Sequence, residues 1–353
     1  MALPTNDALL VAKHESYFKR CLSLLPGAFQ REDTSRMTLG FFCLAGLDIL
    51  GALNSAISEA ERQEYIDWVY AQQITPEHTT MPGCCGFQGG PFTGPLPSSP
   101  QDRDQRGDTL ITASLPSTYS ALACLIILGD DLSRVNRPAI IASLKALQTK
   151  EGGFRSHPFT NEADLRILYC ACVISHLLQD WSGVDQPGAV RYIQHCQGYD
   201  GGIGLGPGQE SHGGTTYCGV ASLKLMGCLD KGLVNKAATM RWCVHRQQQG
   251  FHGRINKDDD TCYSFWVGAT LSMLDSYHLI DIHAQRHFLL STQRFIGGFA
   301  KYPGEYPDPY HAYFGLTAFS MMNESGIQEI IPELNLTKTS YAKFFQRSMG
   351  DSS

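Results

Sequence analysis

The sequence predicts an all-α fold, an α-α barrel made of repeated helical hairpins. Glycine turns that end in an apolar residue recur at Phe154, Ile203, Phe251 and Phe299, at intervals of 49, 48 and 48 residues. A helical pattern precedes each turn, a strongly apolar helical pattern follows it, and strand-like alternation is scarce. A fixed period of this size is typical of one supersecondary unit repeated along the chain.

The helix before each turn is expected to lie on the outside of the barrel. In "NRPAIIASLKALQ", Asn136 is a suitable N-cap and Pro138 stands in the first turn. The apolar residues that follow recur at three to four positions, which is typical of a helix with one buried face.

The turn itself ends this outer helix, because glycine enters left-handed conformations at little cost. A glutamine stands six residues before the apolar turn residue in three copies, at Gln148, Gln197 and Gln293, and His245 has this place in the remaining copy. The segment "CCGFQGG" around Phe87 resembles an earlier copy, 67 residues before the next one.

The helix after each turn is apolar on almost all sides, so it is expected to be buried. These stretches span residues 164–178, 214–227, 260–274 and 311–322, with similar ones at 36–50 and 115–129. About six outer and inner pairs favour closure into a barrel over an open solenoid. Because every inner helix begins after a turn, the polar residues at their starts should converge at one end.

The whole chain, 1–353, is expected to form this single domain. The one long irregular segment, at about 89–111, is rich in Gly, Pro and Ser. Loops of this length are either functional or disordered, and both interpretations stay open.

The composition limits the kinds of binding partner and the cellular compartment that we expect for this chain. A net charge of −6 argues against nucleic acid or an anionic membrane as the main partner. Many of the twelve cysteines lie in apolar stretches and none forms a C-x-x-C pair, which indicates free thiols in a reducing compartment. No apolar run reaches eighteen residues and the start lacks a secretory signal pattern, so we expect a cytoplasmic protein that is not integral to a membrane.

Three of the converging residues suggest a metal site. Asp260 and Cys262 stand two apart at the start of one inner helix, and His311 begins the next. Carboxylate, thiolate and imidazole are good zinc ligands, and three protein ligands leave a fourth position open, as in catalytic sites. The alternative is that Asp260 caps its helix and Cys262 is a core residue.

Four further residues suggest an anion site. Arg254 and Lys257 precede the same inner helix, His212 begins the previous one, and Tyr263 follows Cys262. Cations and a phenol could stabilise the charge of a departing diphosphate. The alternative is a solvated turn in which the two basic residues pair with the aspartates that follow them.

Rings follow these polar residues into the inner helices, at Tyr169, Tyr217, Trp266 and Tyr313. They would line an aromatic cavity beside the metal and anion sites, or they would simply pack in the core.

The repeats and the motifs "GRINKDDDTCYSFWVGATL", "ESHGGTTYCGVASL" and "GGFAKYPGEYPDPYHAYFG" resemble the β subunits of protein prenyltransferases over about residues 15–335, most closely the geranylgeranyl-transferring type I class. The resemblance implies an α-α barrel that works as a heterodimer with an α subunit. It implies one Zn²⁺ per β subunit, and transfer of a geranylgeranyl group from geranylgeranyl diphosphate to the cysteine of C-terminal CaaX sequences, X often Leu, of Rho-type small GTPases.

The resemblance also assigns residues. The zinc ligands fall on Asp260, Cys262 and His311. The diphosphate-binding positions fall on His212, Arg254, Lys257 and Tyr263, and the isoprenoid-contacting positions on Arg166, Tyr169, Cys218 and Trp266.

Two further positions distinguish among members of the family. Thr38 stands where the farnesyl-transferring enzymes carry a tryptophan, and a smaller side chain there would deepen the cavity for a twenty-carbon chain. Lys301 stands where those enzymes use an aspartate to hold magnesium; a lysine could neutralise the diphosphate directly, so we expect no Mg²⁺ requirement.

The sequence departs from the family near the expected pocket for the acceptor's last residue. Ser114, Pro116 and Ile167 stand there instead of the expected His, Ala and Phe. The preference for a terminal leucine is therefore an open expectation.

Other functions remain as alternatives. The farnesyl- and Rab-type prenyltransferases are the nearest. A protonating terpene cyclase needs a D-x-D-D acid, and Lys257 breaks that pattern. A non-catalytic helical-repeat scaffold is a third possibility, and neither it nor a cyclase should purify with stoichiometric zinc.

Overall fold

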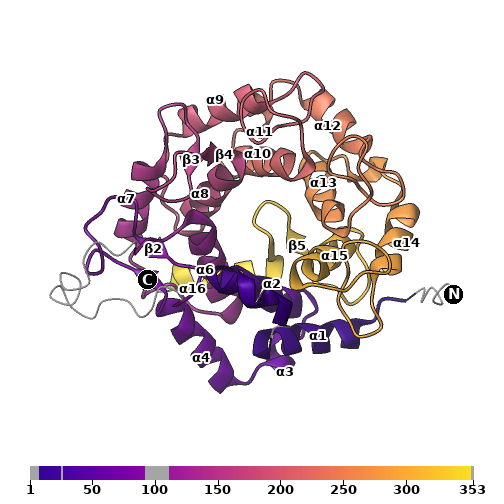
Figure 1. The fold of residues 1–353 in the computed structure, drawn as a ribbon, viewed down its shortest axis with the longest axis horizontal. Helices are drawn as coiled ribbons and strands as arrows, with labels where there is room; N and C mark the ends of the chain where they lie inside the picture. The colour runs from indigo at the N-terminus through magenta and orange to yellow at the C-terminus, as the bar shows by residue number, and fades with distance from the viewer. Residues whose placement is uncertain (1–7, 25–26, 92–110, 351–353) are drawn as a thin grey trace.

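A computed structural model describes residues 8–24, 27–91 and 111–350. In this part of the chain the helices form two concentric rings (Figure 1). The all-α barrel expected from the repeats is therefore confirmed. Most of the predicted irregular loop, at 92–110, lies outside the described residues.

The inner ring consists of the helices that follow the turns. They are α2 (Arg36–Ile49), α6 (Leu115–Leu128), α8 (Leu165–Leu177), α10 (Gly213–Leu225), α13 (Thr261–Met273) and α15 (Pro309–Met321). Each packs against the next in this order, and α15 packs against α2, which closes the ring. Their side chains are buried on almost all sides, as their apolar sequences predicted.

The outer ring consists of partly exposed helices, of which all but the first precede a turn. They are α1 (Val11–Ser23), α4 (Glu59–Tyr70), α7 (Arg137–Leu147), α9 (Gln186–Cys196), α12 (Lys236–Val244) and α14 (Ile282–Thr292). Asn136 caps α7 as predicted, and Asp185, Asn235 and Asp281 cap α9, α12 and α14 in the same way. Each cap satisfies a backbone N–H that the helix leaves free.

Further elements complete the described part of the chain. They are η1 (Gly27–Ser35), α3 (Leu53–Ala56), α11 (Leu229–Gly232), η3 (Tyr277–Leu279) and α16 (Lys338–Gly350). Three antiparallel pairs of two-residue strands also occur: β1 (Gln73–Ile74) with β2 (Gly86–Phe87), β3 (Phe154–Arg155) with β4 (Ala163–Asp164), and β5 (Ile330–Ile331) with β6 (Leu336–Thr337). None of the helices in the described ranges is long and apolar enough to cross a membrane.

Each turn is fastened to the next outer helix by its glutamine side chain. Gln148 accepts the N–H of Asp185 at 2.7 Å and donates to the Asp185 carbonyl at 3.1 Å. Gln197 makes the same two contacts with Asn235, at 3.4 and 3.3 Å. Because Asp185 and Asn235 are N-caps, the glutamines set where each outer helix begins.

The last glutamine closes the ring. Gln293 accepts the N–H of Leu10, the N-cap of α1, at 2.8 Å and donates to the Ala8 carbonyl at 3.1 Å. Gly297 follows at φ +89°, and a Cβ there would lie 2.0 Å from the Lys13 carbonyl oxygen. Only glycine permits this close approach, so the final turn is joined directly to the first helix.

In the third copy His245 has the place six residues before Phe251, but the contact with the next outer helix is made two residues later. Gln247 fills the role instead: it accepts the N–H of Asp281 at 2.9 Å and donates to the Asp281 carbonyl at 2.8 Å. Gln247 stands four residues before Phe251, with which it forms the bridge typical of the repeat. This turn is two residues shorter than the others, so counting six positions back missed it.

The earlier copy around Phe87 is confirmed. Gln73 pairs with Phe87 in the β1–β2 ladder, accepts the N–H of Asn136 at 2.7 Å and donates to the Arg134 carbonyl at 3.0 Å. Gln73 therefore joins this turn to the start of the next outer helix, as the other glutamines do, although the turn here is longer.

The β5–β6 hairpin reaches toward the centre of the ring (yellow in Figure 1). Tyr169 and Tyr217 donate hydrogen bonds from their hydroxyls to the carbonyls of Glu333 and Pro332, at 3.2 and 2.7 Å. Tyr313 donates to the Asn335 carbonyl at 3.0 Å. These buried tyrosines of α8, α10 and α15 fix the hairpin across the barrel.

We predict that Gln247→Ala lowers the free energy of unfolding by about 1–2 kcal/mol, because two hydrogen bonds that join neighbouring repeats are lost. Urea unfolding measures the effect. The control is Gln248→Ala, since Gln248 is the exposed neighbour, and its effect should stay within about 0.5 kcal/mol. Equal effects of the two substitutions would contradict the stabilising role of the Gln247 hydrogen bonds to Asp281.

Candidate active site

The starts of the inner helices gather at one end of the ring, which we call the mouth and define by four N-caps: Asp164, His212, Asp260 and Asp308. Each side chain accepts a backbone N–H of its own helix. The first residue of an inner helix also donates its N–H to the turn of the following repeat, in the pairs Leu115–Ser156, Leu165–Leu205, Gly213–Gly253 and Thr261–Lys301. The starts of these inner helices are therefore held at fixed positions relative to the neighbouring turns.

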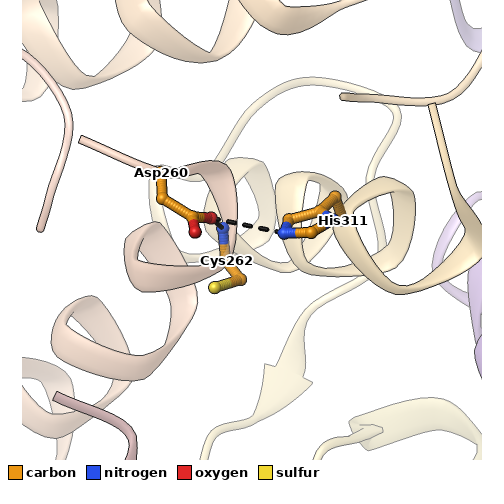
Figure 2. Close-up of side chains that lie close together, drawn as sticks. All are labelled: Asp260, Cys262 and His311. Atoms are coloured by element: carbon orange, nitrogen blue, oxygen red, sulfur yellow. Dashed lines mark hydrogen bonds and ion pairs between the residues drawn. The ribbon is translucent and has the colours of Figure 1, made fainter. Parts of the chain in front are cut away.

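The three predicted metal ligands lie together at this mouth. The ligand atoms of Asp260, Cys262 and His311 all lie within 4.8 Å of one another. Figure 2 shows the Asp260 carboxylate at the start of α13 facing the His311 imidazole at the start of α15, with the Cys262 thiol below the carboxylate. The Asp260 Oδ1 to His311 Nε2 distance is 3.4 Å, and both Asp260 and Cys262 are buried.

The capping role of Asp260 is also correct, and it does not compete with metal binding. Its Oδ1 accepts the Cys262 N–H at 2.9 Å, while Oδ2 lies 3.9 Å from the Lys301 ammonium. A carboxylate has lone pairs on both oxygens, so one can cap the helix while the group binds a cation.

Asp308 orients the imidazole, and the sequence analysis missed it. Its Oδ2 lies 2.6 Å from His311 Nδ1, and its Oδ1 accepts the His311 N–H at 2.9 Å. With Nδ1–H bonded to a carboxylate, Nε2 is the nitrogen presented to Asp260. Metal-binding histidines usually have such a partner. The available signal was an aspartate three residues before a histidine at a helix start.

The protonation behaviour of this cluster reflects two negative charges beside one imidazole. Burial alone lowers the pKa of His311, but Asp260 and Asp308 outweigh it and raise this pKa to about 9. Burial and the Asp260 carboxylate raise the pKa of the Cys262 thiol well above its ordinary value. A divalent cation would compensate both effects, so the donor set fits a metal such as zinc.

His212 and Tyr263 lie side by side next to this cluster. His212 Nδ1 accepts the Gly214 N–H at 3.0 Å, so its proton is on Nε2, which donates to the Tyr263 hydroxyl oxygen at 2.9 Å. Burial, followed by the charge of Arg254, lowers the pKa of His212, which keeps the ring neutral. The Tyr263 O–H is then left to donate to another group.

Arg254 does not pair with the aspartates that follow it. It forms an ion pair with Glu210 of the preceding repeat, at 3.2 Å. Asp259 instead accepts the backbone N–H groups of Gln249 and Gly250 at 3.0 and 2.9 Å. The pairing of Arg254 with these aspartates is therefore wrong, although its side chain is 42% exposed.

Lys257 is exposed on the turn before α13. Among the described residues, no hydrogen bond or ion pair joins it to His212, Arg254 or Tyr263. Arg166 is held by Asp164 through a 2.8 Å ion pair at the start of α8.

Aromatic rings continue from the mouth into the barrel. Trp266 donates from Nε1 to the Tyr310 hydroxyl at 3.1 Å, and its ring lies 5.0 Å from that of Tyr217. The hydroxyls of Tyr217 and Tyr169 are 2.9 Å apart. Cys218, beside Tyr217 on α10, is only 5% exposed. The predicted isoprenoid positions therefore adjoin one another on α8, α10 and α13.

Thr38 lies on the other side of the ring. Its hydroxyl is 3.3 Å from that of Ser120, so two small side chains face each other between α2 and α6. Ser114 caps α6, Pro116 stands in the first turn of that helix, and Ile167 is buried in the first turn of α8. These starts are adjacent because α6 packs against α8.

Comparison with known proteins agrees with this geometry. The prenyltransferase alpha-alpha toroid domain family matches residues 9–336. The geranylgeranyl transferase type-1 subunit beta of Arabidopsis thaliana is 40% identical over 336 residues, covering 92% of this chain and 88% of the relative. That of Dictyostelium discoideum is 41% identical over 339 residues, covering 94% and 96%.

A farnesyl relative and a solved structure are also similar. The protein farnesyltransferase subunit beta of Arabidopsis thaliana is 32% identical over 287 residues, covering 79% of this chain and 53% of the relative. The Candida albicans protein geranylgeranyltransferase-I complexed with GGPP superposes with a TM-score of 0.85 and 30% identity, over 96% of this chain and 98% of that one.

We predict that the apparent affinity of the three-residue cluster for Zn²⁺ rises with pH between pH 6 and 8. His311, with a pKa of about 9, and the Cys262 thiol, whose pKa is raised, are both protonated in this range and must lose their protons to bind a metal. Calorimetry in buffers of different ionisation enthalpy should therefore count about two protons released per metal. No proton release would contradict the assignment of these ligands.

Proposed function

Because the chain belongs to the prenyltransferase alpha-alpha toroid family and is similar over most of its length to type-1 geranylgeranyl transferase β subunits, we propose that it is the catalytic β subunit of a zinc-dependent protein geranylgeranyltransferase type I. It transfers a geranylgeranyl group from geranylgeranyl diphosphate to the cysteine of C-terminal CaaX sequences, X often Leu, of Rho-type small GTPases. The observation that carries the proposal is the meeting of Asp260, Cys262 and His311 at the mouth of a closed barrel.

Asp260, Cys262 and His311 are the proposed ligands of one Zn²⁺. Two of them are buried, and Asp308 holds the third in a fixed orientation. Three protein ligands leave one tetrahedral position open. When bound there, zinc supplies a Lewis acid that lowers the pKa of an acceptor thiol, which is otherwise about 8.5.

The proposed diphosphate site consists of the donors beside the metal cluster: His212, Arg254, Lys257, Tyr263 and Lys301. The acceptor sulfur forms a bond with C1 of the isoprenoid as the C1–O bond to the diphosphate breaks. The hydrogen bond from His212 leaves the Tyr263 O–H to donate to the departing diphosphate oxygen. Lys301, with its ammonium 3.9 Å from Asp260, lies beside the metal cluster. His212 and Tyr263, which their hydrogen bond already orients, stabilise the developing charge without reorganisation.

Arg166, Tyr169, Cys218, Trp266 and Thr38 are the proposed isoprenoid contacts. The first four lie on adjacent inner helices, from Arg166 at the mouth inward. The facing pair Thr38 and Ser120 occupies little volume, which supports room for a twenty-carbon chain.

The protein is further proposed to act as one domain, in a heterodimer with a prenyltransferase α subunit, in the cytoplasm. Similarity over most of the chain to type-1 β subunits supports the heterodimer.

The direct test offers the heterodimer equal amounts of farnesyl and geranylgeranyl diphosphate, with a peptide that ends in cysteine, two aliphatic residues and leucine. We predict a dominant twenty-carbon adduct by mass spectrometry. Thr38→Trp should reverse the preference toward the fifteen-carbon adduct, because the larger ring shortens the cavity by about one isoprene unit. Thr339→Trp, the same change at an exposed threonine of α16, is the control and should keep the wild-type preference.

A dominant fifteen-carbon adduct from the wild-type enzyme would contradict the type I assignment. Absence of any adduct from zinc-loaded heterodimer would favour the scaffold alternative.

We predict that activity persists when Mg²⁺ is removed and zinc is retained, because Lys301 supplies the positive charge. Lys301→Ala should lower kcat by about 10- to 100-fold while zinc content stays stoichiometric. Lys145→Ala, a change at an exposed lysine of α7, should have no effect. Collapse of wild-type activity on removal of Mg²⁺ alone would overturn the role of Lys301.

A further inference from the structure

Two arginines at the mouth are both paired with carboxylates, but the two pairs differ in kind. Asp164 accepts the Arg166 N–H at 2.8 Å as the N-cap of α8 and is only 14% exposed, so its ion pair with Arg166 is part of the fold. Glu210 is 63% exposed, and its 3.2 Å contact with Arg254 is the one hydrogen bond or ion pair of its carboxylate among the described residues. The second pair can therefore open at little structural cost.

The backbone on either side of the Glu210–Arg254 pair is nevertheless fixed. Gly204 forms a bridge with Ser211, and a Cβ on Gly204 would lie 2.5 Å from the Gln209 carbonyl oxygen. The Gly213 N–H donates to the Gly253 carbonyl at 2.8 Å, which joins the two turns directly. The scaffold thus keeps the Glu210 side chain within reach of Arg254 while leaving the side chain itself mobile enough to leave.

Glu210 and Arg254 also belong to the electrostatic surroundings of the anion donors. The charges of Arg254 and Glu210 act in opposite directions on the pKa of His212, Arg254 lowering it and Glu210 raising it. A carboxylate here offers the guanidinium the same kind of oxygen acceptor as a phosphate does.

We propose that Glu210 is a displaceable counter-ion of Arg254 that competes with the diphosphate of the isoprenoid substrate and of the inorganic product. This inference rests on the proposed function of Arg254 as a diphosphate donor. Substrate binding exchanges the Glu210 carboxylate for a diphosphate oxygen, and the return of Glu210 assists release of inorganic diphosphate. Glu210 is a positioning residue, since it acts through Arg254.

The direction of the change in diphosphate affinity distinguishes competition by Glu210 from a purely structural role. Glu210→Gln removes the competing charge, so binding should become tighter, whereas loss of a purely structural contact would weaken binding. An exposed ion pair contributes about 0.2–1 kcal/mol, which corresponds to a change in Kd of up to about fivefold.

The test measures the Kd of inorganic diphosphate and of geranylgeranyl diphosphate for the zinc-loaded heterodimer. We expect Glu210→Gln to tighten both by about two- to fivefold, with a smaller gain at 0.5 M salt because the pair is exposed. In an Arg254→Gln background, Glu210→Gln should change neither Kd.

The matched control is Glu162→Gln. Glu162 is exposed and stands two residues before the N-cap of α8, as Glu210 stands two residues before the N-cap of α10. The charge change and the place in the repeat are the same, but Glu162 has no arginine partner among the described residues. Its Kd values should match those of the wild type.

Other outcomes would overturn the inference. Equal tightening by both glutamate substitutions would show a general effect of charge. If Arg254→Gln weakened diphosphate binding but Glu210→Gln left it unchanged or weakened it, Glu210 would not compete with the diphosphate. The proposed role of Arg254 as a diphosphate donor would still stand. If Arg254→Gln bound both ligands with the Kd values of the wild type, the diphosphate would not lie at Arg254. The inferred role of Glu210 and the proposed role of Arg254 as a diphosphate donor would then both be wrong.

Discussion

The hydrogen bond from the first N–H of α6, α8, α10 and α13 to the turn of the following repeat is the constraint on which the site depends. The Thr261 N–H bonds to the Lys301 carbonyl, and the Gly213 N–H bonds to the Gly253 carbonyl. Chemistry-bearing residues lie within a few positions of these anchors. Because the anchors are backbone groups, the spacing between repeats does not depend on the side chains that do chemistry, and those side chains can differ from one repeat to the next.

The N-cap position links the fold to the chemistry. Asp260 satisfies a helix start and also faces His311 and Lys301, while Asp308 caps α15 and orients the imidazole. A capping carboxylate is held rigidly by the backbone it bonds to, which is what a metal site requires of its ligands. The same position in α8 holds Asp164, which is committed to Arg166 instead.

Much of this could be predicted from the sequence because it depends on period and position. The regular interval between apolar turn residues such as Phe251 and Phe299 predicted the barrel, and helix starts in adjacent repeats predicted that Asp260, Cys262 and His311 meet. Gln247 was missed because a two-residue change in turn length shifts the count. The Glu210–Arg254 pair joins different repeats, and side-chain pairing across repeats leaves no periodic trace.

The most direct test of the account is the Zn²⁺ affinity of the protein carrying His311→Ala, measured by competition with a chelator and compared with that of the wild type. His311 is the one proposed ligand from a different repeat than Asp260 and Cys262, so its substitution tests whether one metal ion joins the two helix starts. The account predicts that the Zn²⁺ affinity falls by on the order of 100-fold or more. Removing a residue that only supports a metal ligand already lowers metal affinity by about 10- to 100-fold, and removing a ligand itself should cost at least as much. An unchanged affinity would contradict it, because the metal site would then not span α13 and α15.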